Sequence, residues 1–141
     1  MVIKIHLLPD NLTTQRVNLM GQTISQKILA RASGRESVTP GEIVWAKVDI
    51  LMSHDPCTPG VASVFKKEFG AQAKVWDAQR FIMIPDHFVY SADAQANQNI
   101  RVMREFAAEQ GIKYFYDVGT PQYKGVCHIG LAEGGHTRPG E

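Results

Sequence analysis

The fold class is decided by residues 81–118, which read FIMIPDHFVYSADAQANQNIRVMREFAAEQGIKYFYDV. The apolar run 81–84 has the length of a strand that is buried on both faces of a sheet. Residues 92–110 carry apolar side chains at helical spacing, with Ser91 as the predicted N-cap. Residues 113–118 are typical of another strand. Strand, helix and strand in this order predict a βαβ unit, and therefore an α/β fold with a mainly parallel sheet and flanking helices.

The chain before this region contains two more predicted helices and one more predicted strand. We expect a helix over 23–33, which Gly34 ends, and a helix over 58–69, which Gly70 ends, because helices often stop at a glycine. Residues 43–52 combine β-branched and apolar side chains with partial alternation, which predicts a single strand.

The two ends of the chain differ in composition from its middle. Residues 1–19 precede a helix pattern that begins just after Met20, and we expect them to form a disordered extension, with a short transit-type leader as the alternative. Residues 20–141 are expected to form a partial α/β domain. Glycine and proline become frequent from Gly119 onward, and one short apolar segment, 126–131, interrupts them. The chain ends without a closing helix or strand, which predicts a domain truncated at its carboxyl end.

The bulk composition excludes several classes of protein. The 141 residues are 44% hydrophobic and 21% charged with a net charge of +1, as in a soluble globular domain. Lysine and arginine are scattered, which argues against a nucleic-acid partner. No apolar run approaches the ~20 residues that span a membrane. The two cysteines, Cys57 and Cys127, fit neither a disulfide framework nor a zinc-binding spacing, and they indicate a reduced, intracellular compartment.

Three histidines are candidates for a functional site. His54 and His87 follow predicted strands, and His128 lies in the glycine-rich region, where we expect a turn. In an open α/β sheet the ligand crevice lies at the carboxyl ends of the strands. Histidine transfers protons near neutral pH, and the neighbouring carboxylates of Asp55 and Asp86 can orient imidazole rings. The sequence therefore predicts a shared histidine and carboxylate site, with ordinary loop histidines as the alternative.

The remaining polar and sulfur-containing side chains carry less information. Cys127 could be a nucleophile or a metal ligand, but a small buried thiol is the simpler interpretation, and the same holds for Cys57. We assign no role to His6 or to His136, which lies among glycines. Reasoning from the residues alone ends at an α/β domain with a histidine and carboxylate site.

Several segments, taken in order, resemble one family closely. The chain is similar to the large subunits of aconitase-family hydro-lyases, above all those of the 3-isopropylmalate dehydratase type. The resemblance covers residues 20–141 and implies the amino-terminal piece of such a subunit. The segments that carry it are MGQTISQKILA (20–30), PGE (40–42), VDILMSHD (48–55), PDHF (85–88), MREF (103–106), GVCH (125–128) and HTRPGE (136–141).

The resemblance implies a specific chemistry. Members of the family bind a [4Fe–4S] cluster through three cysteines, and its open iron acts as a Lewis acid on the departing hydroxyl. The implied reaction is the isomerisation of 2-isopropylmalate to 3-isopropylmalate by dehydration and rehydration, a step of leucine biosynthesis. Asp86 and His87 match the catalytic pair near that hydroxyl, with His87 as its proton donor. His128 matches a second catalytic histidine, and His54 a substrate-binding position that is glutamine in classical aconitases.

The resemblance also implies what this chain lacks. In the family the cluster cysteines, a catalytic serine and the substrate-binding arginines lie downstream, and neither Cys57 nor Cys127 matches a cluster ligand. No residue is therefore assigned to a metal. The small swivelling subunit is a separate partner, and the substrate is a small hydroxy-dicarboxylate. We expect the chain to be inactive alone.

Other interpretations of the resemblance stay open. Homoaconitase and a methylmalate-type dehydratase are the alternative activities. A stand-alone binding or assembly protein without catalytic activity is the alternative from another class. The expected compartment is the cytoplasm, with the plastid stroma as the alternative.

Overall fold

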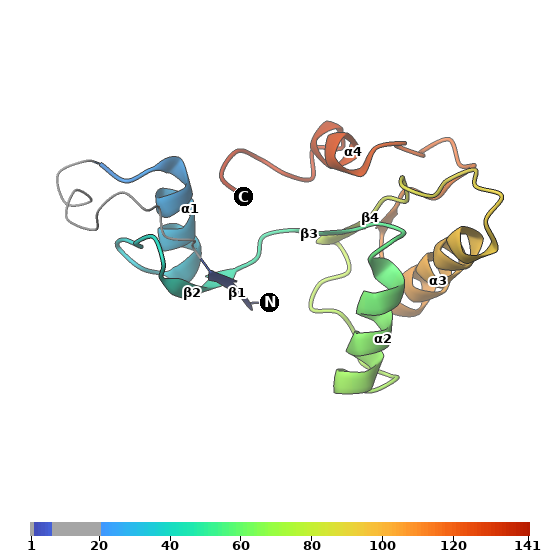
Figure 1. The fold of residues 1–141 in the computed structure, drawn as a ribbon, viewed down its shortest axis with the longest axis horizontal. Helices are drawn as coiled ribbons and strands as arrows, with labels where there is room; N and C mark the ends of the chain where they lie inside the picture. Colours follow the sequence, from blue (N-terminus) through green and yellow to red (C-terminus); the bar gives the residue numbers. More distant parts are fainter. Residues whose placement is uncertain (1, 7–20) are drawn as a thin grey trace. The chain divides into compact units, whose positions relative to one another are not determined.

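The computed structural model describes the backbone of residues 2–6 and all of residues 21–141 (Figure 1). It divides into two compact units. Unit 1 comprises residues 1–49 with 140–141, and unit 2 comprises Ile50–Pro139. The predicted domain, residues 20–141, therefore includes parts of both units.

Unit 1 contains a two-stranded sheet and one helix. Strand β1 (Val2–His6) pairs antiparallel with β2 (Ile43–Lys47), and α1 (Ile24–Ser33) packs against β2. Residues 2–6 of the predicted extension thus form a strand, while residues 1 and 7–20 lie outside the described residues.

Helix α1 has the boundaries that its sequence predicts. The hydroxyl of Thr23 accepts a hydrogen bond from the N–H of Gln26, and the side chain of Gln26 accepts one from the N–H of Thr23. This reciprocal pair satisfies two N–H groups that the helix leaves free. Gly34 ends the helix in the left-handed conformation, with φ of 68°. Ala30, Val38 and Val44 form the small core of the unit.

Unit 2 is an α/β unit, which confirms the predicted fold class. The elements of the unit are β3 (Leu51–Ser53), α2 (Thr58–Phe69), β4 (Phe81–Met83), α3 (Ala94–Gln110), β5 (Tyr114–Phe115) and α4 (Cys127–Glu133). The three strands are parallel and lie in the order β3-β4-β5. Strand β4, helix α3 and strand β5 follow one another along the chain as the predicted βαβ unit.

The central strand β4 is buried on both faces, as its apolar sequence predicts. On one face Phe81 and Met83 pack with residues of α2 and α3, among them Phe106. On the other face Ile82 belongs to a cluster with Cys127 of α4. The sheet therefore lies between α2 and α3 on one side and α4 on the other.

Three predicted features are wrong. The predicted strand 43–52 is interrupted by a bend around Asp49, so that β2 and β3 belong to different sheets. Helix α3 begins after Asp93, whose carboxylate accepts the N–H of Ala96 at 2.8 Å, and not after Ser91. The segment that contains His128 is the helix α4 and not a turn. None of the helices in the described ranges combines the length and apolar character needed to cross a membrane.

Candidate functional site

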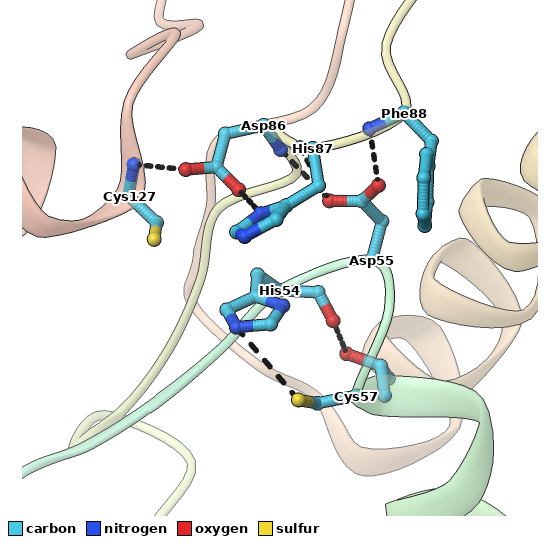
Figure 2. A network of polar contacts seen from close by, with 8 residues as sticks. His54, Asp55, Cys57, Asp86, His87, Phe88 and Cys127 are labelled. Atoms are coloured by element: carbon cyan, nitrogen blue, oxygen red, sulfur yellow. Dashed lines mark hydrogen bonds and ion pairs between the residues drawn. The ribbon is translucent and has the colours of Figure 1, made fainter. Parts of the chain in front are cut away.

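The loops that follow β3 and β4 bring together four of the polar residues singled out by the sequence (Figure 2). Ser53 and Met83 are register partners, and the N–H of Ile84 extends the ladder by donating to the carbonyl of Ser53 at 3.0 Å. Adjacent parallel strands therefore end at the same edge of the sheet. His54 and Asp55 leave the sheet there from β3, and Asp86 and His87 leave it from β4.

The carboxylate of Asp55 organises the loop after β4. Asp55 is fully buried. Its Oδ1 accepts the backbone N–H groups of Asp86 at 2.9 Å and His87 at 3.0 Å, and its Oδ2 accepts that of Phe88 at 2.7 Å (Figure 2). The sequence indicated Asp55 only as a carboxylate that could orient a neighbouring histidine ring. Its position directly after a strand was the one available signal of a larger role.

The loop after β3 is held by the start of α2. The carbonyl of His54 accepts the N–H groups of Cys57 and Thr58, at 3.1 and 3.0 Å. The buried hydroxyl of Thr58 donates to the same carbonyl at 2.8 Å and lies 2.8 Å from the hydroxyl of Ser53. The turn is therefore fixed at both ends, and the positions of His54 and Asp55 are fixed with it.

Asp86 and His87 form a close pair. Nδ1 of His87 contacts Oδ1 of Asp86, and Oδ2 of Asp86 accepts the backbone N–H of Cys127 at 2.7 Å. Burial raises the pKa of Asp86, but the hydrogen bonds from Cys127 and His87 outweigh it, so that the pKa of this carboxyl lies below its ordinary value. An ionised Asp86 favours the proton of His87 on Nδ1 and leaves Nε2 for a ligand. The side chain of His87 is 46% exposed, so a ligand can reach it.

His54 contributes a second imidazole to the same place. Its ring stacks on that of His87, with centroids 4.4 Å apart and an angle of 28° between the planes. Its Nε2 lies 3.7 Å from Sγ of Cys57. Its Nδ1 is buried and has no hydrogen-bond partner among the residues that the structure describes. The structure therefore joins the predicted substrate-binding residue directly to the predicted proton donor.

His128 is less closely connected to this group. It is exposed in the first turn of α4. Within the described part of the chain, no hydrogen bond, ion pair or ring contact joins it to His54, Asp86 or His87. Its connection runs through its neighbour Cys127, whose N–H binds Asp86.

One group of side chains has the composition of a metal site. His54, Asp55 and His87 each offer a ligand atom, and these atoms lie within 4.8 Å of one another. However, both carboxylate oxygens of Asp55 already accept backbone N–H groups. A metal ion would have to compete with these bonds. The geometry therefore supports a structural role for Asp55 better than a metal-binding role.

The cysteines do not fit a [4Fe–4S] cluster. A cluster held by three cysteines needs one more than the two in this chain. Cys57 is exposed, so the interpretation of a buried thiol is wrong there, whereas Cys127 is fully buried as expected. The pKa of Cys127 is raised to about 11, first by burial and then by its hydrogen bond to Asp86 and the charge of that carboxylate. A thiol that stays protonated is a poor metal ligand and a poor nucleophile.

Comparison with known proteins identifies the family. No family model matches the chain. It is 52% identical over 128 residues to the chloroplastic 3-isopropylmalate dehydratase large subunit of Arabidopsis thaliana. The aligned region covers 86% of the chain and 25% of that protein. It is 45% identical over 122 residues to a probable 3-isopropylmalate dehydratase large subunit of Methanothermobacter thermautotrophicus, covering 86% of the chain and 28% of that protein.

A relative named for a different activity has a similar sequence identity to the chain. The chain is 40% identical over 124 residues to a probable methanogen homoaconitase large subunit of Methanothermobacter thermautotrophicus, covering 86% of the chain and 28% of that protein. The chain thus spans about a quarter of the length of the curated relatives it matches. On these similarities, the chain belongs to the aconitase family and is similar to 3-isopropylmalate dehydratase large subunits over 86% of its length.

Proposed function

We propose that this chain supplies part of the catalytic face of a 3-isopropylmalate dehydratase, an iron–sulfur hydro-lyase that converts 2-isopropylmalate to 3-isopropylmalate in leucine biosynthesis. The observation that carries the proposal is the Asp86 and His87 pair at the carboxyl edge of the parallel sheet, in which the His87 side chain is half-exposed. The similarity of 86% of the chain to large subunits of that name supports the same activity.

The chemistry of dehydration gives His87 its role. A hydroxyl group leaves readily only when a proton reaches its oxygen and it departs as water. When the ring of His87 is doubly protonated, Asp86 holds its Nδ1 proton and Nε2 donates the other proton to the leaving oxygen. The ring is then neutral, with its remaining proton on Nδ1. In the rehydration step the same nitrogen takes the proton back from the incoming water. His54 lies against His87 and is proposed to contact the substrate, and His128 is proposed as a second catalytic histidine.

Other parts of the enzyme must complete this site. The cluster ligands are proposed to come from the rest of the large subunit, because the two cysteines here do not fit the cluster. A separate small subunit is the proposed partner, and a hydroxy-dicarboxylate is the proposed substrate. The relative named homoaconitase favours homocitrate-type substrates as the alternative. We place the enzyme in the cytoplasm, or in the plastid stroma, as the chloroplastic relative suggests.

A chimaeric enzyme tests the activity. Residues 20–141 replace the matching quarter of the Arabidopsis thaliana large subunit, and the product is combined with a small subunit and a reconstituted cluster. We expect consumption of 2-isopropylmalate, measured by absorbance of the alkene intermediate. Preferential turnover of homocitrate would support the alternative instead. A chimaera that carries its cluster but turns over neither substrate would contradict the proposal.

The same chimaera tests the role of His87. The variant His87→Gln keeps a side chain of similar size without an imidazole. We expect turnover to fall by ~10²- to 10⁴-fold, which is the usual contribution of a general acid. The visible absorption of the cluster should be unchanged, because His87 is not a ligand. Near-normal turnover would remove the proton-donor assignment.

A further inference from the structure

We propose that Asp55 is the positioning residue of this site, and that it sets the location of Asp86 and His87 through their backbone. The inference deepens the proposed function and rests on it for the catalytic role of His87. Its structural part can be tested without any activity.

The contacts of Asp55 are all directed at the main chain of one loop. Three successive N–H groups, those of residues 86, 87 and 88, converge on its carboxylate at 2.7–3.0 Å (Figure 2). Hydrogen bonds from N–H groups to an ionised carboxylate are stronger than those between neutral groups, and burial strengthens them further. One side chain therefore fixes the backbone of both members of the Asp86 and His87 pair.

Asp55 can act in this way because its own position is fixed. The preceding carbonyl, that of His54, accepts two N–H groups and one hydroxyl from the start of α2. Thr58 and Ser53, which complete this arrangement, are buried. The Asp55 carboxylate is thus fixed in place by the loop after β3, and it binds the backbone of the loop after β4. The two loops keep a constant separation as a result.

The geometry argues against two other roles for Asp55. As a metal ligand it would have to give up hydrogen bonds to the loop. As the orienting partner of an imidazole it would need a contact with a ring nitrogen, but within the described residues the hydrogen bonds to its carboxylate all come from backbone N–H groups. The ring of His87 is oriented by Asp86 instead. Asp55 therefore acts on His87 through the main chain.

The first experiment uses the 141-residue chain with its sequence unchanged. Nuclear magnetic resonance can detect scalar couplings across hydrogen bonds, here between the amide nitrogens of residues 86–88 and the carboxylate carbon of Asp55. We expect all three couplings. Their absence in the folded chain would overturn the proposal without any need for a variant.

The second experiment compares Asp55→Asn with the matched control Asp77→Asn. Asparagine retains one oxygen acceptor but turns an amide N–H₂ toward a backbone donor. Asp77 also accepts a backbone N–H, from Gln79 at 2.8 Å, but it lies away from the site. We expect the amides of residues 86–88 to exchange with solvent at least ~10-fold faster in Asp55→Asn and to be unchanged in the control. Equal exchange in both variants would overturn the proposal.

A third readout separates positioning from general stability. The ¹⁵N shifts of the His87 ring report which nitrogen carries its proton. In Asp55→Asn we expect the share of the Nδ1–H form to fall, because Asp86 and His87 are no longer held together, while Asp77→Asn keeps the natural value. Unchanged ring shifts together with faster amide exchange would reduce Asp55 to a merely structural residue and overturn the positioning role.

The chimaeric enzyme links this test to catalysis. There Asp55→Asn should lower kcat at least ~10-fold with a smaller change in KM, since misplacement of a catalytic group weakens the transition state first. If the unmodified chimaera is inactive but the resonance experiments succeed, the proposed function fails and the structural inference stands. A chimaera that is active and insensitive to Asp55→Asn would overturn the inference alone.

Discussion

The backbone N–H of Cys127 donates a 2.7 Å hydrogen bond to Oδ2 of Asp86, and this bond joins the start of α4 to the loop after β4. The two residues affect each other. The bond helps to lower the pKa of Asp86, while burial and the charge of that carboxylate raise the pKa of Cys127 to about 11. Thiol-specific reagents and changes of pH can therefore both report on the contact between Cys127 and Asp86.

The two thiols should react at very different rates. At pH 8 we expect one fast reaction with an aromatic disulfide reagent, at the exposed Cys57, and slow modification of the buried Cys127. The variant Cys57→Ser should lose the fast phase, and Cys127→Ser should keep it. Two fast phases in the native chain would contradict the burial of α4 against the sheet.

Stability should decline in alkaline solution because of Cys127. Its pKa lies near 9 in an unfolded chain and at about 11 in the fold. The folded state holds this proton more tightly, so its contribution is complete below pH 9 and is lost as the pH rises toward 11. This pKa difference of two units corresponds to at most about 3 kcal/mol in the free energy of unfolding.

Urea unfolding at pH 8 and pH 10.5 measures this loss. Cys127→Ala is the control, because it retains the other groups that titrate in this range, such as Tyr116 and Tyr123. We expect the free energy of unfolding of the natural chain to fall more steeply than that of the variant. Parallel pH profiles would refute the assignment.

Helix α4 should not tolerate a methyl group at Gly130. A Cβ there would lie 2.6 Å from Cβ of Lys124 and 3.4 Å from Cδ1 of Ile84. We expect Gly130→Ala to lower the free energy of unfolding by about 1–3 kcal/mol, as overpacking does. Gly60→Ala in α2 is the matched control, because a Cβ at Gly60 meets no atom within 4 Å. Equal stabilities of the two variants would contradict the tight packing of α4.

His136 should make the fold sensitive to mild acid. Its Nε2 lies 2.5 Å from the hydroxyl of Tyr116, and its ring packs on Tyr114. Burial, and then the charge of Lys124, lower the pKa of His136. The folded state therefore binds this proton less readily than the unfolded state. Its contribution is present above pH ~6.5 and is lost as the pH falls below that value.

A substitution isolates this effect. In His136→Gln the decrease in the free energy of unfolding between pH 7 and pH 5 should be smaller than in the natural chain, because the other histidines remain in both. Thermal unfolding followed by circular dichroism measures the difference. A larger decrease in His136→Gln than in the natural chain would show that protonation of His136 stabilises the fold.

Local sequence signals predicted the elements that local interactions determine. Helix α1 begins after Thr23 and ends at Gly34, as the sequence indicates. Helix α2 spans the predicted residues, from Thr58 at the start to Phe69 at the end. The apolar run at β4 is buried as expected. For the two helices the deciding contacts lie within a few residues of one another, and for β4 the deciding feature is a continuous apolar run.

Features that depend on distant contacts were missed. The break near Asp49 separates two units, and nothing in the apolar run 43–52 marks it. Helix α4 is short and contains a glycine, and Cys127 at its start binds Asp86, 41 positions away. Asp55 reaches partners 31 to 33 positions away. The places of His54 and His87 after two strands were predictable, but the contacts of Asp55 with the loop after β4 were visible only in three dimensions.

Successive N–H groups that point into one concavity commonly capture a dissolved anion such as phosphate. In the loop 86–88 that anion is the side chain of Asp55, which is attached to the same polypeptide. Its effective concentration at the loop is therefore constant, whatever the surrounding solution contains. Phosphate or sulfate in a buffer cannot readily displace it, and added salt screens a buried carboxylate only weakly. The shape of this loop should accordingly be the same in dilute and in concentrated electrolyte.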